Sequence, residues 1–152
     1  FETILKYAKK LGPKTLAVAA AEDDDVLKAV EYARLEGIID AVLIGDKEKI
    51  GTILKDNCIA SENYIILDEK SKEDACNKAV QLVKTGRAST IMKGFVDTSV
   101  ILKAVLNKET GLPVKGLLSH VGVLKVDRYD RFFIISDSAM NISPTLEIKR
   151  IS

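Results

Sequence analysis

Along residues 1–107 the apolar positions follow two patterns that alternate. Short runs are apolar at nearly every position, which is typical of a strand covered on both faces. Between the runs, apolar residues recur every three to four positions, which is typical of an amphipathic helix. The runs predict four strands, at Thr15–Ala21, Ala41–Asp46, Asn63–Glu69 and Ser89–Gly94. The spacing predicts five helices, through Phe1–Leu11, Val26–Ala33, Ile50–Leu54, Ala75–Val83 and Thr98–Asn107.

Regular alternation of helices and strands favours a parallel sheet with helices on both faces, joined by right-handed crossovers. After Pro113 this alternation stops. The strand-like runs at 115–126 and 131–137 are separated only by “DRYD”, which is too short for a helical crossover and suits a hairpin. The sequence therefore predicts an α/β fold: a three-layer, doubly wound sandwich whose sheet is mostly parallel but mixed.

The final segment turns at Pro144 and begins a predicted helix at Thr145, about two turns before the last residue. We expect more protein to follow such a short helix. Residues 1–152 are accordingly predicted to form one amino-terminal α/β domain of a longer protein.

Charge and composition restrict the classes of partner. Lys and Arg number 23 against 22 Asp and Glu, so no overall field favours nucleic acid or a membrane surface. No apolar run approaches the roughly 18 residues that a membrane helix needs, so we expect a soluble cytoplasmic protein. Cys58 and Cys76 lack C-x-x-C spacing and a neighbouring His, so both are predicted to be small buried apolar residues rather than metal or redox sites.

The segment “KGFVDTS” joins the fourth strand to the fifth helix, at the sheet edge where α/β proteins bind ligands. Lys93 offers a positive charge and Gly94 allows close approach of the backbone. Thr98 and Ser99 offer donors in the first helical turn, so the segment suits a phosphate group. The order of residues is neither a Walker A loop nor G-x-G-x-x-G. The structural alternative is that Asp97 caps the helix and Lys93 is solvated.

Polar residues near the predicted hairpin are further candidates. Ser119 and His120 are neighbours in an apolar strand, where they point to opposite faces and cannot form a catalytic pair. His120 is either a hydrogen-bonded structural residue or a ligand contact. Asp137 ends the last predicted strand and Asn141 follows it, and Asp137 is either a functional carboxylate or a turn residue. The carboxylate clusters “EDDD” and “DEKSKED” are interpreted as helix caps and solvated faces, not metal sites.

Three segments together resemble a known family: “MKGFVDTSVILKAVLNKETGL”, “LLSHVGVL” and “ISDSAMNISPTLE”. “AVAAAEDDDVLKAV” and “DAVLIGD” fit the same pattern, so the resemblance covers nearly the whole chain. The chain is similar to the amino-terminal half of the phosphate butyryltransferase and phosphate acetyltransferase family. Met-Lys-Gly and Ser-His-Val place it nearer the butyryl branch.

This resemblance implies reversible transfer of a short acyl group between coenzyme A and inorganic phosphate, with no metal or other cofactor. It also implies a fold resembling isocitrate and isopropylmalate dehydrogenases, and a homo-oligomer. Lys93, Gly94, Thr98 and Ser99 are expected near the phosphoryl group, and the four candidates near the hairpin are expected to line the same cleft. The family's acid/base carboxylate lies in its carboxy-terminal half, so His120 and Asp137 are weak catalytic candidates and the chain alone is expected to be inactive.

Two other functions stay open. One is an acyltransferase that uses acyl carrier protein and shares the fold and phosphate chemistry. Because a carrier protein is acidic, that function needs a basic groove, which the near-neutral composition favours little. The other is a non-catalytic regulatory domain that binds coenzyme A or a phosphometabolite.

Overall fold

The computed structural model describes residues 2–112, 119–126, 128–129 and 131–136. The chain divides into two compact units. One comprises residues 2–112, and the other comprises residues 113–152 together with Phe1. The predicted helix after Pro144 lies outside the described residues.

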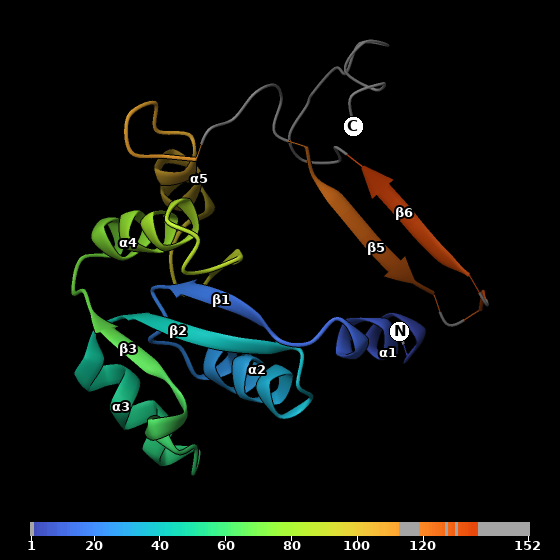
Figure 1. The fold of residues 1–152 in the computed structure, drawn as a ribbon, viewed down its shortest axis with the longest axis horizontal. Coiled ribbons are helices and arrows are strands. Elements are labelled where there is room, and N and C mark those ends of the chain that lie inside the picture. Colours follow the sequence, from blue (N-terminus) through green and yellow to red (C-terminus); the bar gives the residue numbers. More distant parts are fainter. Residues whose placement is uncertain (1, 113–118, 127, 130, 137–152) are drawn as a thin grey trace. The chain divides into compact units, whose positions relative to one another are not determined.

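The first unit is a parallel sheet with helices on both faces, as predicted. Figure 1 shows α4 and α5 on one side of this sheet and α2 and α3 on the other. The strand order is β3-β2-β1-β4, and all three pairings are parallel. The strands are β1 (Lys14–Ala19), β2 (Ile39–Gly45), β3 (Ile65–Asp68) and β4 (Thr90–Lys93). The helices are α1 (Glu2–Lys10), α2 (Asp24–Leu35), α3 (Lys47–Asp56), the short 3-10 turn η1 (Ser61–Asn63), α4 (Lys72–Lys84) and α5 (Thr98–Val105).

Strand β1 is central in the sheet, and its two faces belong to different hydrophobic clusters. Ala17 and Ala19 pack into one cluster with residues of α4 and α5. Leu16 and Val18 pack into the other, with residues of α2 and α3. Since the side chains of a strand alternate between faces, this division explains why the run is apolar at every position.

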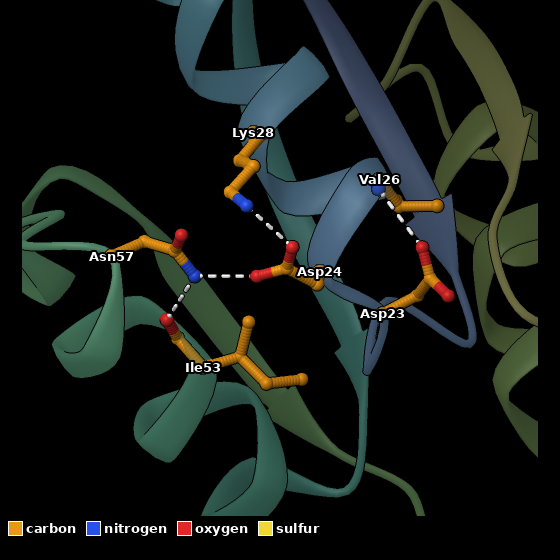
Figure 2. Close-up of polar contacts among 6 residues, drawn as sticks. All are labelled: Asp23, Asp24, Val26, Lys28, Ile53 and Asn57. Atoms are coloured by element: carbon orange, nitrogen blue, oxygen red, sulfur yellow. Dashed lines mark hydrogen bonds and ion pairs between the residues drawn. The ribbon is translucent and has the colours of Figure 1, made fainter.

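The acidic cluster after β1 is used at helix ends, as the sequence predicts (Figure 2). Asp23 is the N-cap of α2, and its carboxylate accepts a hydrogen bond of 3.0 Å from the Val26 N–H. Asp24 pairs with Lys28 at 2.5 Å and accepts a 2.7 Å hydrogen bond from the Asn57 side chain. Because Asn57 follows α3, this second bond joins the start of α2 to the end of α3.

Four helices end in the same way, with a positive φ at the second residue after the helix. Gly12 after α1, Gly37 after α2 and Gly86 after α4 adopt this conformation without a steric penalty. Cys58 fills the equivalent position after α3 with φ of 55°, and its side chain is exposed. The prediction that both cysteines are buried is therefore correct for Cys76 and wrong for Cys58, because this turn directs Cys58 to the surface.

We expect Cys58→Gly to raise the free energy of unfolding by about 1 kcal/mol, because glycine adopts a positive φ without the steric penalty of a side chain. Urea unfolding of the protein measures this difference. Cys58→Ala is the matched control: it removes the thiol but keeps the Cβ atom, so its stability should stay near that of the wild type. An equal increase in the free energy of unfolding in both variants would mean that the thiol, and not the positive φ, destabilises the wild type.

A polar cluster fastens α2 to the segment before β3. Arg34 donates to both carboxylate oxygens of Glu31, at 2.8 and 2.9 Å, and the Tyr64 hydroxyl donates to the same carboxylate. The Arg34 guanidinium also lies 6.0 Å from the centroid of the Tyr64 ring. The hydrogen bond from Arg34, and then that from Tyr64, lower the pKa of Glu31 from its ordinary 4.5.

Because the folded state lowers the pKa of Glu31, ionised Glu31 stabilises the fold above pH 4.5, and this contribution is lost as the pH falls through the folded-state pKa. We expect Glu31→Gln to lower the free energy of unfolding at pH 7 by about 1–2 kcal/mol. The difference from wild type should shrink as urea unfolding is repeated towards pH 3. Glu62→Gln, at an exposed position, is the control. A difference that stays constant with pH would contradict this assignment.

The second unit contains the predicted hairpin, formed by β5 (Val121–Lys125) and β6 (Phe132–Ser136). Val123 lies opposite Ile134 in an antiparallel register. Within this unit the two strands form a two-stranded antiparallel sheet. Among the described residues, no helix is both long and apolar enough to cross a bilayer.

Candidate functional site

The candidate site lies at the carboxyl edge of the four-stranded sheet. Because all four strands are parallel, their carboxyl ends meet at one edge, where open α/β sheets bind ligands. The connections that start there lead from β1 to α2, from β2 to α3, from β3 to α4 and from β4 to α5. Two of these, before α4 and before α5, together form one pocket.

The turn from β4 to α5 is fixed against the end of β1. The Gly94 N–H donates to the Ala19 carbonyl and the Phe95 N–H donates to the Ala20 carbonyl, both at 2.8 Å. A Cβ atom on Gly94 would lie 2.8 Å from the Ala19 oxygen and would overlap the Ala20 oxygen. Ala20 is fully buried and has φ of 54°, a conformation that costs energy for a residue other than glycine. The turn is therefore held tightly against a strained residue, and strained residues are common near functional sites.

The pocket beside this turn has a volume of about 390 Å³. Lys72 and Glu73 contribute from the first turn of α4, residues 93–97 contribute from the β4–α5 turn, and Val100 contributes from α5. Two lysines and two carboxylates thus surround it, with apolar surface from Phe95 and Val96. A phosphate-sized anion fits this volume, and the lysines are the cations that bind it as point charges.

Lys93 is exposed, but its side chain is not simply solvated. Its ammonium group donates to the Val96 carbonyl at 2.8 Å and to the Gly94 carbonyl at 3.3 Å. An ammonium group has three donors, so one stays available for a ligand. These contacts hold the charge of Lys93 over the turn, which is the placement that the phosphate interpretation needs.

Asp97 occupies the N-cap position of α5, but its carboxylate makes no capping hydrogen bond. The structural alternative therefore places Asp97 correctly at the N-cap. The side-chain hydrogen bond that defines a cap is not formed, however. Thr98 and Ser99 are the first two residues of α5, and both are exposed. Within the described part of the chain, their backbone N–H groups have no acceptor, so they are available to an anion. Neither side chain lines the pocket itself.

The other candidates belong to the second unit, which is described by itself. Ser119 and His120 are exposed residues just before β5, in the second unit. Asp137 and Asn141 lie outside the described residues. The interpretations of these four residues therefore stay predictions.

A second hollow on the same edge has a different charge. It measures about 420 Å³ and is lined by Glu22, Glu48, Lys49, Thr52 and Ile53. One carboxylate oxygen of Glu22 is buried against Gly45 and, within the described part of the chain, has no hydrogen-bond partner. Two carboxylates against one lysine do not suit an anion, so this hollow is a poorer phosphate site than the one beside Lys93.

Sequence reasoning missed Lys72 and Phe95 as pocket residues. The signal for Lys72 was present, since “DEKSK” also follows a strand and reaches the same edge. Its mixed charges were interpreted as a solvated face. Phe95 gave no separate signal, because an apolar residue in a turn looks the same whether its ring is buried or exposed. Its side chain is in fact 61% exposed.

Comparison with known proteins agrees with this geometry. Residues 67–150, which include the whole β4–α5 turn, match the family described as phosphate acetyl/butaryl transferase. A phosphate butyryltransferase of Clostridium beijerinckii is 40% identical over 98% of this chain, and a phosphate acetyltransferase of Thermotoga maritima is 37% identical over 97%. The chain spans only 49% and 50% of those two proteins.

Solved structures show the same relationship. The crystal structure of a branched-chain phosphotransacylase from Enterococcus faecalis V583 matches with a TM-score of 0.71 and 27% identity, covering 87% of this chain and 45% of that one. A phosphotransacetylase from Streptococcus pyogenes shares the fold, with a TM-score of 0.76 over 97% of this chain and 54% of that one, at 18% identity. The fold, the residues of the turn and the similarity along nearly the whole chain agree with one another: the chain belongs to the phosphate acetyl/butaryl transferase family.

Proposed function

We propose that the protein containing this chain transfers a short acyl group, butyryl or a related one, reversibly between coenzyme A and inorganic phosphate. The observation that carries the proposal is the family match, which includes the β4–α5 turn and its pocket. Relatives that match across almost the whole chain are named for transfer to phosphate of butyryl or acetyl groups. Because the chain spans about half their length, we propose this activity for a protein in which residues 1–152 are the amino-terminal α/β domain.

The reaction needs a cationic, donor-rich phosphate site. In one direction the thiolate of coenzyme A attacks the carbonyl carbon of an acyl phosphate, a thioester bond forms, and the carbon–oxygen bond to phosphate breaks. A thiol has an ordinary pKa near 8.5, so a base must take its proton. The departing phosphate carries the electron pair of the broken bond, and nearby cations and N–H groups stabilise it.

In this scheme the β4–α5 turn holds the phosphoryl group. Lys93 supplies a charge and one free donor, and the N–H groups of Thr98 and Ser99 supply two more donors. Gly94 lets the turn lie close to β1, so these groups are held in place before the substrate arrives. The thiol's base is assigned to the part of the protein beyond this chain. Ser119, His120, Asp137 and Asn141 are proposed to line the same cleft.

The proposal extends to the setting of the enzyme. Coenzyme A and phosphate are its substrates and it needs no further cofactor. The near-neutral charge and the family fit a cytoplasmic homo-oligomer acting on small molecules. Size-exclusion chromatography with light scattering gives the molar mass in solution and so measures the oligomeric state.

A thiol-release assay on the complete protein tests the activity. Acetyl-CoA, butyryl-CoA and a branched acyl-CoA are each supplied with and without phosphate, and free thiol is followed over time. We expect release that depends on phosphate and is fastest with butyryl-CoA or the branched substrate. Release that ignores phosphate would indicate a thioesterase. Phosphate or coenzyme A binding without release would indicate a regulatory domain, and transfer only from acyl carrier protein would indicate the other acyltransferase class.

A further inference from the structure

Lys72 and Phe95 form a pair across the candidate pocket. Lys72 is the first residue of α4 and is half-buried, and its ammonium nitrogen lies 4.4 Å from the centroid of the Phe95 ring. Phe95 belongs to the β4–α5 turn. The first turn of α4 and the β4–α5 turn therefore meet through one cation–aromatic contact, and both residues line the pocket that also contains Lys93.

The backbone of Phe95 is held at one place beside the pocket. The Phe95 N–H donates to the carbonyl of buried Ala20, and Gly94 before it has no room for a side chain. An exposed phenylalanine forfeits the stabilisation that burying its ring would give. A ring face near a lysine ammonium, however, attracts that charge. The Phe95 ring therefore presents its face to the Lys72 ammonium at the pocket wall.

The donors of Lys72 are uncommitted. Glu73 and Asp97 line the same pocket, yet within the described part of the chain Lys72 forms no salt bridge with either carboxylate and no hydrogen bond. Lys93 differs, because two backbone carbonyls already accept from its ammonium group. Lys72 consequently has all three N–H donors available to a ligand, whereas Lys93 has one.

We propose that Lys72 is a second cationic ligand for a phosphoryl group in this pocket and that Phe95 is the positioning residue that holds it there. The proposal rests on the proposed function, because it assigns Lys72 to a substrate of that reaction. The phosphoryl group comes either from inorganic phosphate and the acyl phosphate, or from the phosphates of coenzyme A. The shared chemistry is recognition of a phosphate anion by a lysine ammonium.

Steady-state kinetics of the complete protein separate these sources, with phosphate and the acyl-CoA varied independently. We expect Lys72→Ala to raise one KM about fivefold to tenfold while kcat changes less than about twofold, in line with one partly exposed charged contact. Lys72→Arg should restore most of the loss. Phe95→Leu keeps apolar bulk without the ring and should raise the same KM by about threefold. Lys78→Ala is the matched control, since Lys78 is a half-buried lysine on the same helix outside this pocket.

The KM that changes identifies the source of the phosphoryl group. A higher KM for phosphate assigns the phosphoryl group to phosphate and the acyl phosphate, and a higher KM for the acyl-CoA assigns it to coenzyme A. Both KM values unchanged in Lys72→Ala, or changed equally in Lys78→Ala, would overturn the proposal. If the wild type shows no phosphate-dependent transfer, the proposed function fails, and calorimetric titration of wild type and Lys72→Ala with inorganic phosphate and with coenzyme A tests Lys72 separately. Equal affinities for each ligand in the two proteins would then overturn it.

Discussion

Gly94→Ala is expected to lower the free energy of unfolding by about 3 kcal/mol or more, because overpacking at a site that cannot relax reaches the upper end of its usual range. The added methyl group would overlap the carbonyl oxygen of Ala20 and lie 2.8 Å from that of Ala19. Both atoms belong to the backbone at the end of β1, and Ala20 is fully buried with a positive φ. The three described atoms nearest to the added methyl group are all backbone atoms, which cannot move aside as the end of a flexible side chain can.

Urea unfolding of the protein measures this effect, and Gly51→Ala is the matched control. Gly51 lies inside α3, and among the described residues nothing outside the helix's own backbone lies within 4 Å of the position its Cβ would take. The same chemical change should therefore stabilise the protein there by about 1 kcal/mol, as alanine does in helix interiors. Opposite signs at the two positions are the expected result. A Gly94→Ala protein as stable as the wild type would mean that the turn does not pack against β1 as described.

The order of elements in the first unit was predictable because buried strands and amphipathic helices leave two different patterns of apolar residues in the sequence. The run “TLAVAAA” is apolar at every position since β1 is covered on both faces, and the structure gives it two separate hydrophobic clusters. Asp23 and Ser71 were predictable as N-caps because a capping side chain acts within its own turn. Local chemistry was enough in each case.

Features that depend on contacts between distant segments were not predictable in this way. Cys58 has the turn position that glycine usually fills, and its residue type gave no warning of a positive φ. The turn at Lys93 was found from its place after a strand. Lys72 has the same kind of place, but its mixed-charge surroundings did not distinguish it until α4 was placed beside that turn.

Lys93→Ala is expected to raise the KM for phosphate about tenfold to a hundredfold in the proposed reaction, because a hydrogen bond to a charged group contributes about 1.5–3 kcal/mol. Lys93 is better placed than a freely solvated lysine, since its contacts with the Gly94 and Val96 carbonyls already fix its ammonium group over the turn. Thr98→Ala should have a smaller effect, because its backbone N–H stays in place when the hydroxyl is removed.

Steady-state assays with varied phosphate measure the change, and Lys103→Ala is the matched control because it removes one exposed positive charge from α5 outside the pocket. Thermal unfolding must accompany the assays, since Lys93→Ala also removes two bonds to the turn, with an expected loss of stability of about 1 kcal/mol. A raised KM in a folded Lys93→Ala protein, with Lys103→Ala unchanged, would make the turn a phosphate site. Wild-type kinetics in all three variants would leave the β4–α5 turn as a structural connection and move the search for the phosphate to another part of the protein.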